Sequence, residues 1–180
     1  MKYFISITSI VILSLSCGHG IKNAEQAEPL HFVYADKKCD YYVKVVGITD
    51  GDTFKGLTNS NEEIKFRIYA IDAPEKKQDY GDRAKQYLSA LIFGKTVGIK
   101  VQRKSDQYGR PIVWVFTEDG KDVSAEMLKA GMAWHYKRYD STPEYADYES
   151  KARKAKLGLW ADKHPVSPWD FKKGSKSLRK

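Results

Sequence analysis

Two short segments of the sequence each carry a pair of carboxylates on restrained backbone. The segment TDGDTF holds Asp50 and Asp52 on either side of a glycine, and IDAPE holds Asp72 and Glu75 around a proline. Glycine permits a tight turn and proline fixes φ, so each pair occupies a defined place on the chain. Carboxylates that lie close together raise one another's pKa unless a cation lies among them. If the two segments meet, they predict a cation-binding site.

The ligand atoms decide which cation such a site would hold. Carboxylates without histidine or cysteine nearby favour calcium or magnesium over zinc. The histidines do not have the close paired spacing of zinc-binding helices: His19, His31, His135 and His164. We therefore expect a hard divalent cation. Taken singly, each acidic segment also fits a routine turn or strand end.

Two arginines accompany these acids. Arg67 lies in the segment EIKFRIYAI, and Arg110 ends the turn DQYGR. Guanidinium groups beside a carboxylate-bound cation would neutralise a phosphodiester and the charge that develops on its cleavage. The alternative is an exposed ion pair of ~0–1 kcal/mol for each arginine. Because Arg67 and Asp72 are an odd number of positions apart, the strand must bend before Asp72 to bring them to one face.

The elements that must position these residues begin near Tyr41. Segments rich in β-branched and aromatic residues predict five strands: YYVKVVGI, DTFKGL, EIKFRIYAI, TVGIKVQR and RPIVWVF. Helical spacing predicts a helix that ends at Gly94, a second with Ser124 as its N-cap, and a third from Pro143 to Leu157. Because the first helix follows the third strand, we expect an α+β fold: a five-stranded β-barrel of the oligonucleotide/oligosaccharide-binding (OB) type with about three helices.

The N-terminus has the pattern of an export signal. Lys2 precedes an apolar run and the small-residue exit SLSCGHG, so residues 1–16 are interpreted as a signal peptide. Cys17 resembles the lipid-attachment site of bacterial lipoproteins, although Ser14 stands where leucine is usual. We expect an exported cell-envelope lipoprotein anchored at Cys17; the alternative is a secreted or periplasmic protein.

The rest of the chain divides by composition. Residues 17–40 are polar and are interpreted as a flexible tether, 41–171 as one domain, and 172–180 as a solvated basic tail. The formal net charge is +8 and the isoelectric point is about 9.3. A basic protein favours polyanionic partners such as nucleic acid or anionic lipid, although the charge also fits simple solubility.

Five motifs occur in a fixed order between about Tyr41 and Trp160: DGDT, FRIYAIDAPE, SDQYGRPIVWVF, AEMLKAGMAW and KARKAKLGLW. In this order they resemble the thermonuclease (staphylococcal nuclease-like) family. The resemblance implies a five-stranded barrel with three helices that hydrolyses DNA and RNA with calcium. It further implies a 5′-oxygen leaving group and 3′-phosphate products. We also expect a monomer.

The resemblance also implies a role for each matching residue. Asp52 and Asp72 would bind Ca²⁺ through their carboxylates, and Ala73 through its backbone carbonyl. Glu75 would act as general base. Arg67 and Arg110 would bind the scissile phosphate.

Two positions and one loop differ from the best-known member of the family. Ala73 replaces a threonine, but a ligand that acts through its carbonyl should survive this change. Gln107 replaces a lysine beside the YGR turn, which leaves open one contact to a terminal phosphate and any exonucleolytic preference. The loop after Glu75 is shorter, which would leave the site more open.

Aromatic residues next to these motifs would stack on bases without reading the sequence, at ~1–3 kcal/mol each. Tyr108 matches a tyrosine of the nucleotide pocket, and either Tyr136 or Tyr139 matches the second. Two other functions remain open on the sequence. One is a non-catalytic nucleic-acid-binding OB-fold module on the cell envelope, and the other is a basic lipoprotein that binds anionic surfaces.

Overall fold

The computed structural model describes residues 39–177. The predicted signal peptide, the lipid-attachment residue Cys17 and nearly all of the predicted tether lie outside these residues, so they stay predictions. In the described part of the chain, every helix is too short or too polar to cross a membrane.

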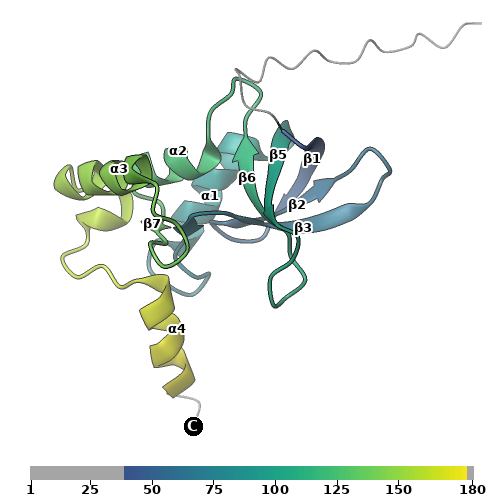
Figure 1. Ribbon diagram of the computed structural model, residues 1–180. Coiled ribbons are helices and arrows are strands. Elements are labelled where there is room, and N and C mark those ends of the chain that lie inside the picture. Colours follow the sequence, from purple (N-terminus) through teal and green to yellow (C-terminus); the bar gives the residue numbers. More distant parts are fainter. Residues whose placement is uncertain (1–38, 178–180) are drawn as a thin grey trace, which may run out of the picture. The chain divides into compact units, whose positions relative to one another are not determined.

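Five strands form a closed barrel in the order β1-β2-β3-β6-β5 (Figure 1). They are β1 (Tyr41–Ile48), β2 (Thr53–Leu57), β3 (Glu63–Ile68), β5 (Thr96–Arg103) and β6 (Ile112–Phe116). Strands β3 and β6 pair in parallel, while the other neighbours are antiparallel. The prediction of a five-stranded OB-type barrel is therefore confirmed.

The barrel interior follows the alternation of apolar residues along the strands. Each strand sends alternate side chains inward, as expected from a period of two. Phe54 of β2 and Phe66 of β3 are fully buried, and their ring centroids lie 5.2 Å apart. This core fixes the register of β2 against β3, and with it the position of the residues at their ends.

The described residues contain four α-helices, α1 (Gly81–Ile92), α2 (Val123–Lys129), α3 (Pro143–Lys154) and α4 (Pro168–Ser177), and a short 3₁₀ helix, η1 (Gly158–Ala161). Helix α1 follows the third barrel strand, as predicted. Helices α2 and α3 pack side by side (Figure 1).

Two helix ends differ from the prediction. Asp122, rather than Ser124, caps α2, because its carboxylate accepts hydrogen bonds from the backbone N–H groups of Ser124 and Ala125. The Ser124 hydroxyl instead donates to the carbonyl of Tyr69, at 2.9 Å. Helix α3 ends at Lys154 instead of Leu157, since Lys156 adopts a positive φ of 54° that the helix cannot continue through.

The predicted third strand is broken where the sequence required a bend. Strand β3 stops at Ile68, and Ala70 adopts a left-handed φ of 64°. The chain then forms β4 (Ile71–Asp72), which pairs with β7 (Trp134–His135) in a separate two-stranded sheet. Strand β7 was not expected from the sequence. The bend is what turns Asp72 toward Arg67.

Helix α4 corrects the interpretation of the C-terminal segment. Lys172, the expected start of a solvated tail, lies inside α4, which continues to Ser177. The ring of Trp169 stacks on Tyr136, with centroids 5.5 Å apart and planes 6° apart, and also contacts the edge of Trp134. Composition alone suggested a solvated segment because the apolar anchor, Trp169, precedes the basic run.

Candidate active site

The two acidic segments meet because small residues allow close approach. A Cβ added to Gly51 would lie 2.6 Å from the Cβ of Ala73 and 2.8 Å from that of Ala84, so a larger residue at this position would separate the loops. The backbone N–H of Ala73 donates to Oδ2 of Asp52 at 2.8 Å. This bond joins the DGDT turn directly to the IDAPE segment.

Arg67 lies between the two carboxylates that the sequence singled out. Its Nη2 lies 3.1 Å from Oδ2 of Asp52 and 3.0 Å from Oδ1 of Asp72. All three side chains are at most 12% exposed. Burial alone would lower the pKa of Arg67, but the charges of Asp52 and Asp72 raise it above its usual value. The guanidinium therefore stays charged and holds the acids together.

Backbone pairing places both arginines at the same rim of the barrel. Arg67 pairs with Thr53 of β2 on one side and with Ile112 of β6 on the other. Its N–H donates to the carbonyl of Pro111 at 2.9 Å. Because Pro111 directly follows Arg110, the parallel pairing of β3 with β6 brings Arg110 to the site.

Arg110 is held by Asp106, an acid for which the sequence predicts no role. Its Nε and Nη2 lie 2.9 and 2.7 Å from Oδ2 of Asp106, and its Nη1 donates to Oγ1 of Thr53 at 3.1 Å. Burial would raise the pKa of Asp106, but hydrogen bonds from Arg110 and Tyr108 lower it below its usual range. Thr53 in turn donates to Oδ1 of Asp52 at 3.0 Å, so this pair connects to the central cluster.

Glu75 occupies one end of the site and is 40% exposed. It lies in the loop before α1, and its carbonyl packs against Gly81, where any Cβ would collide with it. Its Oε1 lies 2.8 Å from Nζ of Lys172 on α4. Lys172 also approaches Oδ1 of Asp72, at 3.5 Å. The contacts link Glu75 to the cluster of Asp52, Arg67 and Asp72.

Carboxylates outnumber the cations in contact with them at the centre of the site. Burial first and the charge of Asp52 second raise the pKa of both Asp50 and Asp72 to about 6. Arg67 and Lys172 oppose this rise at Asp72. Among the described residues, no three histidine, cysteine or acidic side chains are arranged as ligands for one metal ion. The cations found among these acids are the guanidinium of Arg67 and the ammonium of Lys172.

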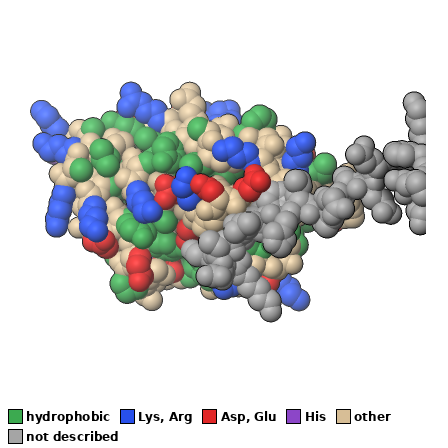
Figure 2. All heavy atoms as spheres, turned by 90° about the horizontal axis from the view of Figure 1, so that it is seen from above, with side chains coloured by type: hydrophobic (Ala, Val, Ile, Leu, Met, Phe, Trp, Pro, Cys, Tyr) green, Lys and Arg blue, Asp and Glu red, His purple; other side chains and the backbone are tan. Residues whose placement is uncertain are grey.

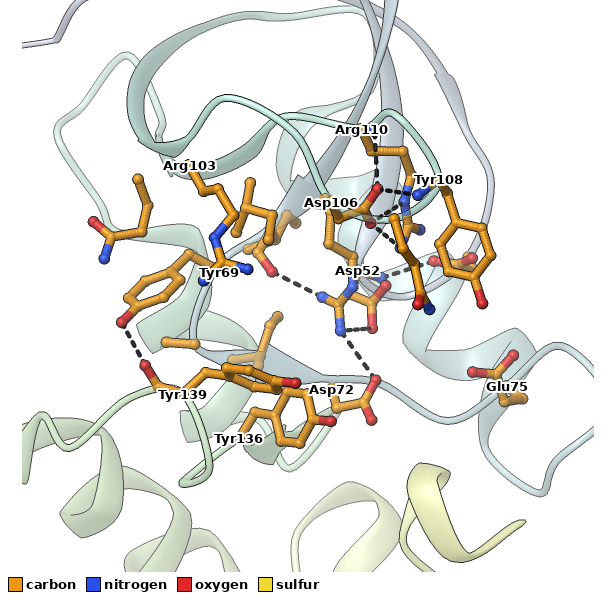
Figure 3. Close-up of a pocket in the computed structure, with 18 of the residues that line it drawn as sticks. Asp52, Tyr69, Asp72, Glu75, Arg103, Asp106, Tyr108, Arg110, Tyr136 and Tyr139 are labelled. Carbon is orange, nitrogen blue, oxygen red and sulfur yellow. Dashed lines mark hydrogen bonds and ion pairs between the residues drawn. The ribbon is translucent and has the colours of Figure 1, made fainter. Parts of the chain in front are cut away.

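One cleft of about 740 Å³ is lined by the predicted side chains of Asp52, Arg67, Asp72, Glu75, Tyr108, Arg110, Tyr136 and Tyr139. Ala73 is not among the lining residues and is 3% exposed. Asp52 and Asp72 point toward one another, Tyr136 and Tyr139 lie together along one wall, and Tyr108 lies on the opposite side (Figure 3). Tyr108 is 73% and Tyr139 54% exposed, so their rings are open to a ligand. Tyr136 and Tyr139, the two candidates for the second tyrosine, both line the cleft.

Acidic and basic side chains also mix on the molecular surface. Figure 2 shows red acidic groups gathered beside blue ones near the centre of the face, with more Lys and Arg toward the edges. Five acidic and four basic residues are among the described residues that line the cleft.

Three residues of the site, Asp106, Asp50 and Lys172, had no role predicted from the sequence. Asp106 accepts from the backbone N–H of Tyr108 and of Arg110 within one turn, which is the local pattern of an Asx turn and could have been predicted. Asp50 forms a pair with Asp52 in the sequence, but the sequence predicts no separate role for it. Lys172 had no local signal, because its contact with Asp72 spans 100 positions.

The fold and the cleft define a class of protein: an OB-type barrel whose rim gathers carboxylates and two arginines beside exposed tyrosines. The model of the family described as Staphylococcal nuclease homologue matches residues 65–162. This match covers more than half of the chain, and the chain therefore belongs to the staphylococcal nuclease homologue family. Membership supports a nuclease, a hydrolase of nucleic acids, as the class of enzyme.

Individual relatives agree with this family. A protein named "Uncharacterized endonuclease" from Escherichia coli O157:H7 is 40% identical over 130 residues, which are 72% of this chain and 84% of the relative. A second "Uncharacterized endonuclease", from Haemophilus influenzae, is 39% identical over 133 residues, or 74% of each chain. "Staphylococcal-like nuclease CAN1" of Arabidopsis thaliana is 38% identical over 128 residues, which are 68% of this chain and 39% of the plant protein.

Proposed function

We propose that the protein is a calcium-dependent phosphodiesterase that hydrolyses DNA and RNA with little sequence specificity. The observation that carries this proposal is the convergence of Asp52, Arg67 and Asp72, with contacts of 3.1 and 3.0 Å, in one cleft. Glu75 and Arg110 line the same cleft. The proposed leaving group is the 5′-oxygen, which gives 3′-phosphate products.

The donor set of the cleft suits a hard divalent cation. Burial first and the charge of Asp52 second raise the pKa of Asp50 and Asp72, so a cation bound here would offset the repulsion among these carboxylates. Carboxylate and carbonyl oxygens are the ligands that calcium prefers. Asp52, Asp72 and the carbonyl of Ala73 would hold the ion. Once bound, it would supply positive charge beside the scissile phosphate.

The protein's own residues divide the remaining work. Glu75 is exposed enough to meet a water molecule and would accept its proton as general base. Arg67 and Arg110 carry planar forks of donors at the cleft, which suit phosphate oxygens and the charge of a pentacoordinate transition state. Both arginines are paired with acids in this structure, so substrate oxygens would exchange with or add to these partners.

The tyrosines would bind the bases. Tyr108 and Tyr139 present exposed rings, while Tyr136 is held between Tyr139 and Trp169. Stacking on a ring face tolerates every base, and none of these three side chains is suited by itself to read a base edge selectively. The arrangement therefore favours broad specificity.

The test compares the protein with its Glu75→Gln variant on single- and double-stranded DNA and on RNA, with calcium and with chelator. Calcium-dependent cleavage to 3′-phosphate ends is expected, and Glu75→Gln should lower kcat by orders of magnitude while the fold is retained. Full activity of Glu75→Gln would reject the general base. Binding of nucleic acid without cleavage would favour the non-catalytic module instead.

We also propose that the enzyme is exported and anchored through Cys17. The charged, apolar and small-residue segments at the start of the sequence support this location. Replacement of Cys17 by Ser should move the protein from the membrane fraction to the soluble fraction. An unchanged membrane fraction would reject lipid attachment at this residue.

A further inference from the structure

Lys172 of α4 contacts two carboxylates of the proposed mechanism. Its Nζ lies 2.8 Å from Oε1 of Glu75 and 3.5 Å from Oδ1 of Asp72. The same oxygen of Asp72 accepts a hydrogen bond from Arg67 at 3.0 Å. We propose that Lys172 is a positioning residue that holds the carboxylate of Glu75 beside the cluster of Asp52, Arg67 and Asp72. This inference rests on the proposed function, in which Glu75 is the general base.

Glu75 has few other restraints on its side chain. It follows Pro74 in the loop that leads into α1, outside the strands and helices of the described residues, and is 40% exposed. A glutamate has several rotatable bonds, so an exposed one samples many positions. A general base must lie within hydrogen-bond reach of the water that it deprotonates. The ammonium of Lys172 restricts the carboxylate to the end of the cleft that faces Asp72.

The side chain of Gln78 bridges the Glu75 loop and the segment before α4. The side-chain oxygen of Gln78 accepts from the N–H of Glu75 at 3.1 Å, and its Nε2 donates to the carbonyl of Val166 at 2.7 Å. Val166 lies two residues before α4 begins at Pro168. The start of α4 is thus tied to the backbone of the same glutamate that Lys172 holds by its side chain.

An aromatic anchor sets the rotation of α4. Trp169 and Lys172 are three positions apart, so they lie on the same face of the helix. Trp169 stacks on Tyr136, which lines the cleft. The face of α4 that carries Trp169 therefore also directs Lys172 toward the acids. The stacking of Trp169 thus fixes the orientation of Lys172, although Lys172 is distant from Glu75 in the sequence.

The next residue on the helix provides a matched control. Lys173 has the same charge and length, but it is 77% exposed and pairs with Asp170 of its own helix at 3.2 Å. Lys172 is 48% exposed and reaches across to another part of the chain. A change at Lys173 removes the same charge from α4 without removing the contact with Glu75.

The experiment measures kcat and KM on a short fluorogenic oligonucleotide at saturating calcium. Lys172→Met should lower kcat by about 10- to 100-fold, since small displacements of catalytic groups have effects of this size, with KM within about threefold. The variant Lys172→Arg should retain most of the wild-type kcat, because arginine keeps the positive charge. Lys173→Met should leave both constants unchanged.

A double variant separates action through Glu75 from an independent role. In the Glu75→Gln background, Lys172→Met should cause no further loss of kcat, because residues that act as a unit are not additive. A purely structural role of Lys172 would instead lower kcat in both backgrounds and would lower the Tm. Lys172→Gln serves as a second neutral variant, judged by the same criteria, if Lys172→Met does not fold.

Three results would overturn the inference. They are an unchanged or raised kcat of Lys172→Met, a rise in KM alone, which would make Lys172 a phosphate-binding residue, and a further tenfold loss in the Glu75→Gln background. Loss of activity in Glu75→Gln together with normal kinetics of Lys172→Met would refute this inference alone. Normal activity of Glu75→Gln would refute the general base of the proposed function.

Discussion

Removal of Arg67 tests the electrostatic centre of the site most directly. Arg67→Met keeps an unbranched chain of similar length but removes the guanidinium that contacts Asp52 and Asp72. It also removes the hydrogen bond from Nη1 to the carbonyl of Ile68, at 2.8 Å. Two buried carboxylates would then face one another without the cation between them.

The cost of this change follows from the burial of the partners. The side chains of Arg67, Asp52 and Asp72 are 12%, 9% and 3% exposed, so solvent screens their charges weakly. Removal of one partner from a buried ion pair destabilises a protein by about 3–5 kcal/mol. For a domain of this size, that free energy corresponds to a fall in Tm on the order of 10–20 °C.

The assay is urea unfolding at neutral pH in the presence of chelator, followed by tryptophan fluorescence. The matched control is Lys55→Met, which removes the exposed pair of Lys55 with Glu63, whose side chains are 46% and 51% exposed. It should cost less than about 1 kcal/mol. If Arg67→Met destabilises the protein no more than this control does, the buried cluster does not hold the rim together.

Two further substitutions test the acids and the second arginine. Asp50→Asn should stabilise the metal-free protein at neutral pH by about 1–3 kcal/mol, because burial and the Asp52 charge raise the pKa of Asp50 from 3.8 to about 6. A carboxyl whose pKa is higher in the folded state makes the protein less stable as the pH rises through about 4 to 6. The gain in stability from Asp50→Asn should therefore vanish below about pH 4 in unfolding measurements. An equal gain at all pH values would contradict this cause. Arg110→Lys should lower kcat/KM by about 100-fold or more, because one ammonium cannot replace the fork that contacts Asp106 and Thr53. Near-normal rates in a cleavage assay would remove Arg110 from the mechanism.

The barrel was predictable because its signals are local. Alternation of apolar residues identified the barrel strands, and the core pair of Phe54 and Phe66 follows from that alternation. Helix ends were less certain, since several polar residues could cap the same turn. Asp122 and Ser124 are both good caps, and only the observed hydrogen bonds distinguish them.

The sequence also predicted a bend before Asp72, but not the backbone conformation that makes the bend. The spacing of Arg67 and Asp72 showed that a regular strand could not serve both residues. Nothing in the sequence marked Ala70 as the residue with a positive φ, because alanine rarely adopts that conformation. The pairing of β4 with β7 and the hydrogen bond from the N–H of Tyr136 to the carbonyl of Ala70 accompany this conformation.

The sequence by itself determined the chemistry of this protein: which side chains carry charge, and that two acidic segments, two arginines and a set of tyrosines belong together. The tertiary structure decided which of these groups touch. Close packing of Gly51 against Ala73 joins the acidic segments, and α4 brings Lys172 to Glu75. Contacts of this kind depend on how distant elements pack, and packing is set by the whole core rather than by any short stretch of residues.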